Sequence, residues 1–133
     1  MNIALMASDR KKELMVQFCI AYCGILAGHS VCATQTTGKL VADATGLPIT
    51  LYLPHSQGGS QQIAARCAYN ELDLVICFSD PASVKYPEEI SEISRLCDQH
   101  NIPFATNVAT AEVLIRALKD GYLDWRDIVN PKQ

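Results

Sequence analysis

The chain has 133 residues, of which 49% are hydrophobic and 19% are charged, and its formal net charge is −3. This length supports one domain with a substantial core and is too short for two, so we predict a single domain over residues 1–133. The longest cationic run, Arg10-Lys11-Lys12, is too short to predict binding to nucleic acid. We therefore expect a small-molecule partner.

The N-terminus lacks the features of a targeting segment. Residues 1–6 enter strand-like sequence directly, without a basic lead or a cleavage site. No apolar run approaches the roughly 18 residues that a membrane span requires. We expect a cytoplasmic protein that does not bind a membrane.

The six cysteines lack the paired spacing of a zinc site and lie in apolar segments, so we expect reduced and mostly buried thiols. Only Cys19 and Cys23, four residues apart on an expected helix, could share a metal, and no second pair of Cys or His lies nearby in sequence. We therefore predict no metal site. The cysteines are Cys19, Cys23, Cys32, Cys67, Cys77 and Cys97.

Apolar and β-branched runs alternate with helical patterns along the chain. After the first strand, Ser8-Asp9 is a helix-capping pair, and apolar residues then follow at helical spacing as far as Gly28. The run 72–78 has the composition of a central strand that is buried on both faces. We predict strands at 2–7, 29–33, 48–53, 72–78 and 102–106, and helices at about 9–28, 39–45, 63–69, 87–96 and 112–119. A last short helix is expected to dock through Trp125 and Ile128.

This alternation predicts an α/β fold, namely one doubly wound, parallel, five-stranded sheet with helices on both faces. In such sheets ligands bind beyond the carboxyl ends of the strands. The expected loops at that edge are all rich in polar groups, so a pocket is predicted there. These loops are 8–9, 34–38, 55–60, 79–89 and 106–110.

The stretch 34–39, Thr-Gln-Thr-Thr-Gly-Lys, is expected to form a hydroxyl-rich loop that leads into a helix. Hydroxyl groups and free backbone N–H groups at a helix N-terminus can bind a phosphate or a carboxylate. The alternative is that these threonines only cap the helix.

The chain has neither the G-x-G-x-x-G fingerprint of dinucleotide-binding proteins nor a complete P-loop. A phospho-receiver domain is also disfavoured, because its required acidic and lysine positions carry Asp9, His55 and Asn107.

Short segments spread over the chain match one known family. They are Ile3-Ala4-Leu5 with Asp9 and Lys12, Ala33-Thr34 with Thr36-Thr37-Gly38, Ala44-Thr45-Gly46-Leu47, Gly58-Gly59 with Gln61-Gln62, Asp80-Pro81, and 103–110 as P-F-A-T-N-V-A-T. On these segments the chain closely resembles the methylglyoxal synthase family over essentially its full length. The resemblance implies a doubly wound α/β fold, assembly into homohexamers, and conversion of dihydroxyacetone phosphate to methylglyoxal and inorganic phosphate without a cofactor.

The resemblance also implies roles for individual residues. Asp9 and Asp80 match acidic active-site positions, and Glu89 stands where the family has another aspartate. From the residues alone, Asp9 would be a helix cap and Asp80 a turn residue before proline. The residues implied to hold the substrate phosphate are Lys12, Thr34, Thr36 and Thr37.

The chain departs from the family at the expected pocket. The family motif G-G-D-Q-Q contains the general base, and its aspartate corresponds to Ser60 here, whose neutral hydroxyl cannot remove a carbon-bound proton. An alignment with one gap places Tyr86 at the family's active-site histidine. Other changes affect Ser8, Gln35 and the pair His55-Ser56. His55, in a loop beside the expected pocket, could in principle serve as the base, although a surface or packing histidine is the simpler interpretation.

Three hypotheses follow. The first is a protein that keeps the phosphate site, has lost or changed the chemistry, and binds a small phosphorylated metabolite or inorganic phosphate. The second is an active methylglyoxal synthase in which Asp9, Asp80, Glu89 or His55 transfers the proton. The third, a purely structural oligomer, is disfavoured by the intact threonine stretch.

Overall fold

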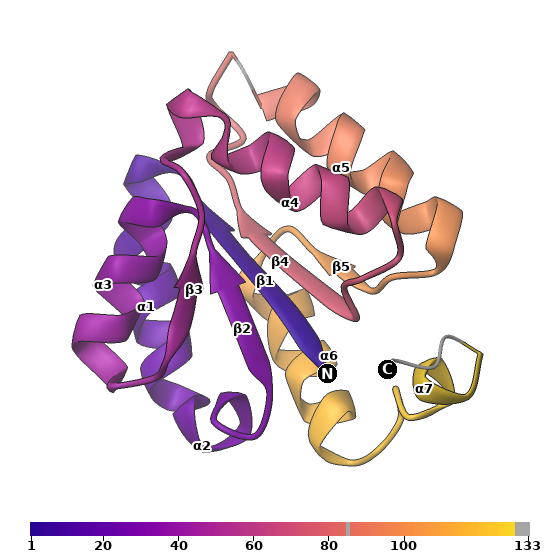
Figure 1. Ribbon diagram of the computed structural model, residues 1–133. Coiled ribbons are helices and arrows are strands. Elements are labelled where there is room, and N and C mark those ends of the chain that lie inside the picture. Colours follow the sequence, from indigo (N-terminus) through magenta and orange to yellow (C-terminus); the bar gives the residue numbers. More distant parts are fainter. Residues whose placement is uncertain (85, 130–133) are drawn as a thin grey trace.

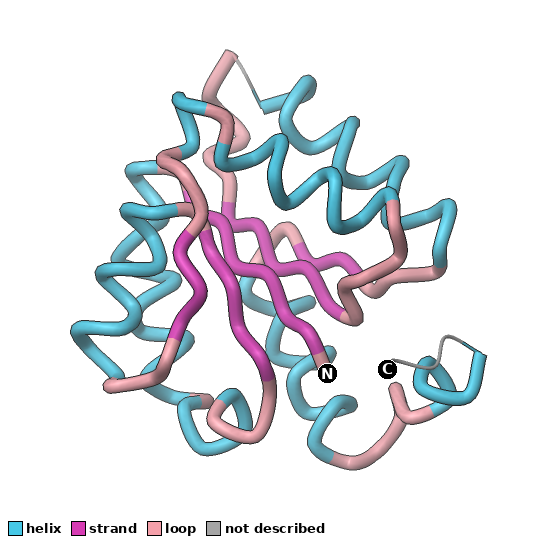
Figure 2. The backbone as a smooth tube through the Cα atoms, in the orientation of Figure 1, coloured by secondary structure: helices cyan, strands magenta, loops and turns pink. Residues whose placement is uncertain are grey.

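The computed structural model describes residues 1–84 and 86–129, apart from the side chains of Tyr86, Pro87 and Glu89. Its centre is a five-stranded sheet in the order β3-β2-β1-β4-β5, and all paired strands are parallel. This arrangement, visible in Figures 1 and 2, confirms the predicted α/β fold. The strands are β1 (Asn2–Ala7), β2 (Ser30–Ala33), β3 (Ile49–Leu51), β4 (Leu74–Phe78) and β5 (Phe104–Ala105).

The central strand β1 pairs with β2 on one side and with β4 on the other, so that Leu5 lies opposite both Ala33 and Ile76. From β1 the chain extends the sheet in one direction through β2 and β3, and then returns to add β4 and β5 on the other side. The order of the strands therefore reverses between β1 and β4. Ligands of doubly wound sheets bind at such a reversal.

Helices cover both faces of the sheet (Figure 1). One apolar core joins the sheet to α1 (Lys12–Ala21), α3 (Gln35–Thr45) and α6 (Val108–Lys119). A second core joins the opposite face to α4 (Gly59–Ala68) and α5 (Tyr86–His100). Every residue of β4 is buried because both of its faces are covered, as its continuous apolar run predicts.

Several helices begin earlier in the chain than the sequence predicts. α3 begins at Gln35 rather than Lys39, α4 at Gly59 rather than Ile63, and α6 at Val108 rather than Glu112. The backbone N–H groups of a first helical turn have no partner within the helix, so polar residues are favoured there. Apolar periodicity begins only after that turn. The predicted first residue of each of these helices therefore lies about one turn after the actual one.

The predicted first helix is divided into three pieces. A short 3-10 helix (Asp9–Lys11) leads into α1, and α2 (Cys23–Leu26) follows after Tyr22. Gly24, a weak helix former, lies in the second of the two α-helices. Ser8-Asp9 is not a capping pair, because the Ser8 side chain makes no capping hydrogen bond and donates to the carbonyl of Phe78 at 3.5 Å.

The cysteines are all free thiols, and all are buried except Cys23, which is half-buried. In the described part of the chain, no helix combines the length and the apolar character needed to cross a membrane.

The last described helix, α7 (Trp125–Val129), docks through a residue that the sequence analysis did not select. Arg126 is 1% exposed, and its Nε lies 3.2 Å from Oδ1 of the fully buried Asp73. The same guanidinium donates to the carbonyls of Leu72 and Asn101. Ile128, which was expected to dock, is instead 79% exposed.

We expect Arg126→Ala to lower the free energy of unfolding by about 3–5 kcal/mol, because it removes the guanidinium that compensates the buried Asp73 carboxylate. Urea denaturation would measure this change. Arg95→Ala, an exposed arginine on α5, is the matched control and should change stability by about 0.5 kcal/mol or less. A loss for Arg126→Ala no larger than that of the control would contradict the role of the buried pair.

Candidate functional site

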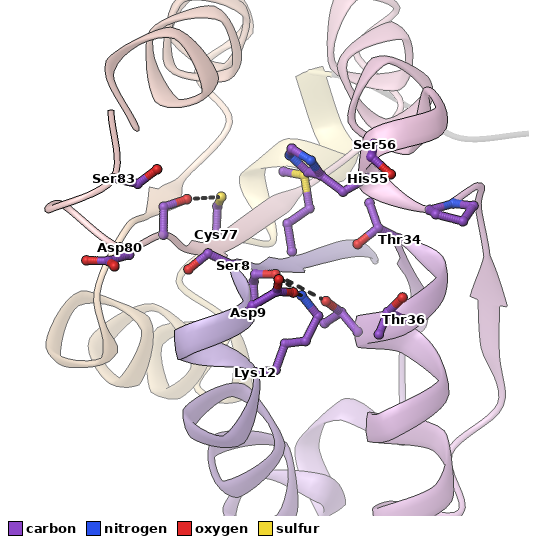
Figure 3. Close-up of a pocket in the computed structure, with 15 residues that line it drawn as sticks. Ser8, Asp9, Lys12, Thr34, Thr36, His55, Ser56, Cys77, Asp80 and Ser83 are labelled. Atoms are coloured by element: carbon purple, nitrogen blue, oxygen red, sulfur yellow. Dashed lines mark hydrogen bonds and ion pairs between the residues drawn. The ribbon is translucent and has the colours of Figure 1, made fainter. Parts of the chain in front are cut away.

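A cavity of about 280 Å³ opens at the carboxyl ends of the central strands, where the strand order reverses. Its floor includes Met6, Ala7 and Cys77, and its rim comes from the segments that follow β1, β2, β3 and β4 (Figure 3). Four of the five predicted polar loops therefore contribute to it. The fifth, after β5, does not line this cavity, but Thr106 and Asn107 line a neighbouring one.

Lys12 and Asp9 form the charged part of the cavity wall. The Lys12 ammonium donates to the Ala7 carbonyl at 3.0 Å and to Oδ1 of Asp9 at 2.8 Å. An ammonium has three donors, so one remains for a ligand. The hydrogen bond and charge of Lys12 hold the pKa of the Asp9 carboxyl below its usual value, and His55 contributes weakly in the same direction. Asp9 does not cap a helix, since its carboxylate bonds a side chain.

The threonines lie at the N-terminus of α3. Thr34 is the N-cap residue and is 3% exposed as a whole, yet its side chain makes no capping hydrogen bond. No buried side-chain nitrogen or oxygen among the described residues lacks a partner, so this hydroxyl is accessible from the cavity. Figure 3 shows this hydroxyl directed toward the cavity. Thr37 is 1% exposed and donates to the Ala7 carbonyl at 3.5 Å, whereas Thr36 is exposed. The capping alternative therefore does not describe Thr34.

Asp80 is both a turn residue and part of the cavity wall. Its Oδ1 accepts a hydrogen bond from the backbone N–H of Ala82 at 3.0 Å, and its Oδ2 lies 3.9 Å from Nε of Arg10. Its side chain is 19% exposed. These contacts fix one carboxylate oxygen to the backbone, while the residue still faces the cavity.

The glycine pair before Ser60 holds α4 close to the chain segment that follows β3. Gly58 has a φ of 102°, and a Cβ on Gly59 would lie 2.0 Å from the carbonyl oxygen of Leu53. Ser60 consequently lies in the first turn of α4, not in a loop, and its hydroxyl donates to Oε1 of Gln61 at 3.1 Å. Ser60 is not among the residues that line the cavity, whereas the exposed His55 is.

The cavity also contains two buried polar residues that the sequence analysis did not assign to the site. Cys77 and Ser79 are each 7% exposed, and their Sγ and Oγ atoms lie 3.3 Å apart. Their position at the end of the buried strand β4 was the available signal, because strand ends at this edge face the ligand site. Tyr86 and Glu89 were predicted for the site, but their side chains lie outside the described residues.

The cavity thus combines one ammonium group, buried hydroxyls, a helix N-terminus, two carboxylates and an imidazole. The described residues hold no group of three Cys, His, Asp or Glu side chains that could bind a metal ion. Such a lining can bind an anion and can, in principle, move protons.

Comparisons with known proteins agree with this arrangement. The family model for the MGS-like domain matches residues 15–106. The chain is 56% identical to methylglyoxal synthase of Caldicellulosiruptor saccharolyticus, over 99% of this chain and 94% of that protein. It is 50% identical to methylglyoxal synthase of Lysinibacillus sphaericus, over 95% of each chain.

A solved structure extends the agreement to three dimensions. The crystal structure of methylglyoxal synthase from Elizabethkingia anophelis NUHP1 superposes with a TM-score of 0.77 at 32% identity, and covers 92% of this chain and 89% of that one. The fold and the predicted resemblance are therefore both confirmed, and the chain belongs to the methylglyoxal synthase family of MGS-like domains.

Proposed function

We propose that the cavity binds the phosphate group of a small phosphorylated metabolite, and that the chemistry typical of a methylglyoxal synthase is impaired or altered in this protein. The observation that carries the first part is the Thr34 hydroxyl at the N-terminus of α3, which makes no capping hydrogen bond and is directed toward the cavity. A hydroxyl that faces the cavity and does not cap the helix can donate a hydrogen bond to a bound anion.

The neighbouring groups support an anion at the same place. The first-turn N–H groups of α3 have no partner within the helix and lie at the positive end of its dipole. Lys12 adds a full positive charge and a remaining donor, while its ammonium is positioned by the hydrogen bond that it donates to the Ala7 carbonyl. Thr36 is exposed at the rim of the cavity and can donate a further hydrogen bond.

The second part of the proposal depends on Ser60. The resemblance of Gly58-Gly59-Ser60-Gln61-Gln62 to G-G-D-Q-Q assigns the base position to this residue. A serine hydroxyl is neutral at physiological pH, and Ser60 donates its proton to the side chain of Gln61. A positioned general base contributes roughly 10²- to 10⁴-fold to the rate, or about 3–5 kcal/mol of the barrier. The protein would then bind its ligand without converting it efficiently.

We expect Lys12→Met to weaken the binding of inorganic phosphate by roughly ten- to a hundredfold, because a charge-assisted hydrogen bond is lost. Isothermal titration calorimetry would measure it, with circular dichroism to verify folding. Lys39→Met removes the same charge from an exposed position of α3 outside the cavity and should change the affinity by less than about threefold. Equal losses in both variants, or no binding by the unmodified protein, would contradict the proposed phosphate site.

An active enzyme is the second candidate, and a specific observation favours it. His55 and Asp80 line the same cavity as Lys12 and Thr34, so a substitute base is available near the proposed phosphate site. The relatives named above are methylglyoxal synthases. In this case one of these side chains would take the carbon-bound proton of dihydroxyacetone phosphate, and loss of phosphate from the resulting enediolate would give methylglyoxal.

If His55 is the base, His55→Ala should lower the release of methylglyoxal from dihydroxyacetone phosphate by roughly 10²- to 10⁴-fold. His100→Ala is the control, because His100 contacts the Ala68 carbonyl and does not line the cavity. A colorimetric assay for methylglyoxal would follow both variants. Turnover by the unmodified protein that persists in His55→Ala would exclude His55 and leave the carboxylates Asp9, Asp80 and Glu89 as candidates.

A further inference from the structure

One nucleophilic side chain of the cavity is not used by the proposed function. Cys77 lies near the carboxyl end of β4, and its thiol is not part of a disulfide. Of the six cysteines, all of which lie in the described part of the chain, it alone lines the cavity, and it is 7% exposed. A cysteine sulfur is intrinsically very nucleophilic, so an electrophilic ligand held in this cavity would meet a group that can bond to it.

Two buried hydroxyl groups line the same cavity as the thiol. The Oγ atom of Ser79 lies 3.3 Å from the Sγ atom of Cys77, and Ser79 is also 7% exposed. Thr34 is 3% exposed, and its hydroxyl is directed into the cavity without capping α3. A serine hydroxyl can accept the thiol proton while it donates its own, because it carries both a donor and acceptor lone pairs. The thiol therefore has a proton relay at its side and an anion-binding group across the cavity.

The sheet sets the separation between the thiol and the proposed phosphate site. The strands β2, which leads to Thr34, and β4, which contains Cys77, flank β1 on opposite sides. Neighbouring strands lie about 4.7–4.9 Å apart, so the ends of β2 and β4 are roughly 10 Å apart. Figure 3 shows Cys77 on the side of Asp80, away from Thr34. A ligand that reaches both sides must carry its phosphate at one end of a short carbon chain and its electrophilic atom at the other.

We propose that Cys77 captures the aldehyde carbon of a short phosphorylated aldehyde as a hemithioacetal. The phosphate would lie at Lys12 and Thr34, which brings the aldehyde to the thiol. The Cys77 sulfur bonds to the aldehyde carbon, and the π electron pair of the carbonyl passes to its oxygen. The proton that leaves the sulfur reaches that oxygen through the Ser79 hydroxyl, so the reversible addition consumes no other reactant. This inference rests on the proposed phosphate site and deepens it by naming the class of ligand.

Two ligands of matched size separate the addition of the thiol from the binding of the phosphate. Glyceraldehyde 3-phosphate and glycerol 3-phosphate have the same carbon chain and the same phosphate, but only the first has an aldehyde. Calorimetry without added thiol reagents would measure both dissociation constants beside that of inorganic phosphate. We expect the aldehyde to bind at least about tenfold more tightly than glycerol 3-phosphate, and this ratio to fall to about one in Cys77→Ala.

A bond to sulfur also gives a signal that a merely structural cysteine would not. Carbon-13 NMR of glyceraldehyde 3-phosphate labelled at the aldehyde carbon, with the protein in excess, should show a hemithioacetal resonance distinct from those of the aldehyde and its hydrate. Cys77→Ala should lose this resonance. Cys23→Ala is the matched control and should retain it, because Cys23 is the half-buried cysteine of α2 and does not line the cavity. If circular dichroism shows that Cys77→Ala does not fold, Cys77→Ser keeps the shape of the side chain and should lose the resonance as well.

Two results would overturn this inference alone. In the first, inorganic phosphate and glycerol 3-phosphate bind, but the aldehyde binds no better or gives no hemithioacetal resonance. In the second, the resonance appears and persists in the Cys77 variants, so another thiol is responsible. If no ligand binds, inorganic phosphate included, the proposed phosphate site fails and this inference fails with it.

Discussion

The candidate site depends on one backbone carbonyl. Ala7 is the last residue of the central strand β1, and its carbonyl accepts from the Lys12 ammonium at 3.0 Å and from the Thr37 hydroxyl at 3.5 Å. A strand-end carbonyl has no helical partner, and the pairing of Ala7 with Phe78 of β4 fixes its position. It therefore positions a cation from α1 and the first turn of α3 at the same point. This geometry places positive charge where the order of the strands reverses.

The two ends of the sheet satisfy their charges differently. At the amino end, Asp73 and Arg126 are almost completely buried, and carbonyls of the surrounding loops accept the remaining guanidinium protons. At the carboxyl end, Lys12 retains a donor, the Thr34 hydroxyl makes no capping hydrogen bond, and Asp9 is 98% exposed. Polar groups that stay accessible at the carboxyl ends of parallel strands are available to a ligand.

Periodicity and turn residues were sufficient to predict the parallel sheet, the buried strand β4 and the edge at which polar loops gather. They could not place the helix starts, because first turns are polar and resemble loops. They also missed Arg126, since a charged residue in a short terminal helix is usually exposed. Ser60 was placed in a loop near the pocket, whereas the close approach of Gly59 to Leu53 puts it in a helix outside the cavity lining. Such long-range contacts leave no local pattern.

The central claim is that the phosphate site remains while the base is missing at position 60. Its most direct measurement is the release of methylglyoxal and phosphate from dihydroxyacetone phosphate by the unmodified protein beside Ser60→Asp, whose longer, charged side chain would restore a base. The account predicts that Ser60→Asp turns over at least about a hundredfold faster than the unmodified protein. Equal and substantial turnover by both proteins would contradict it and would show that another residue removes the proton.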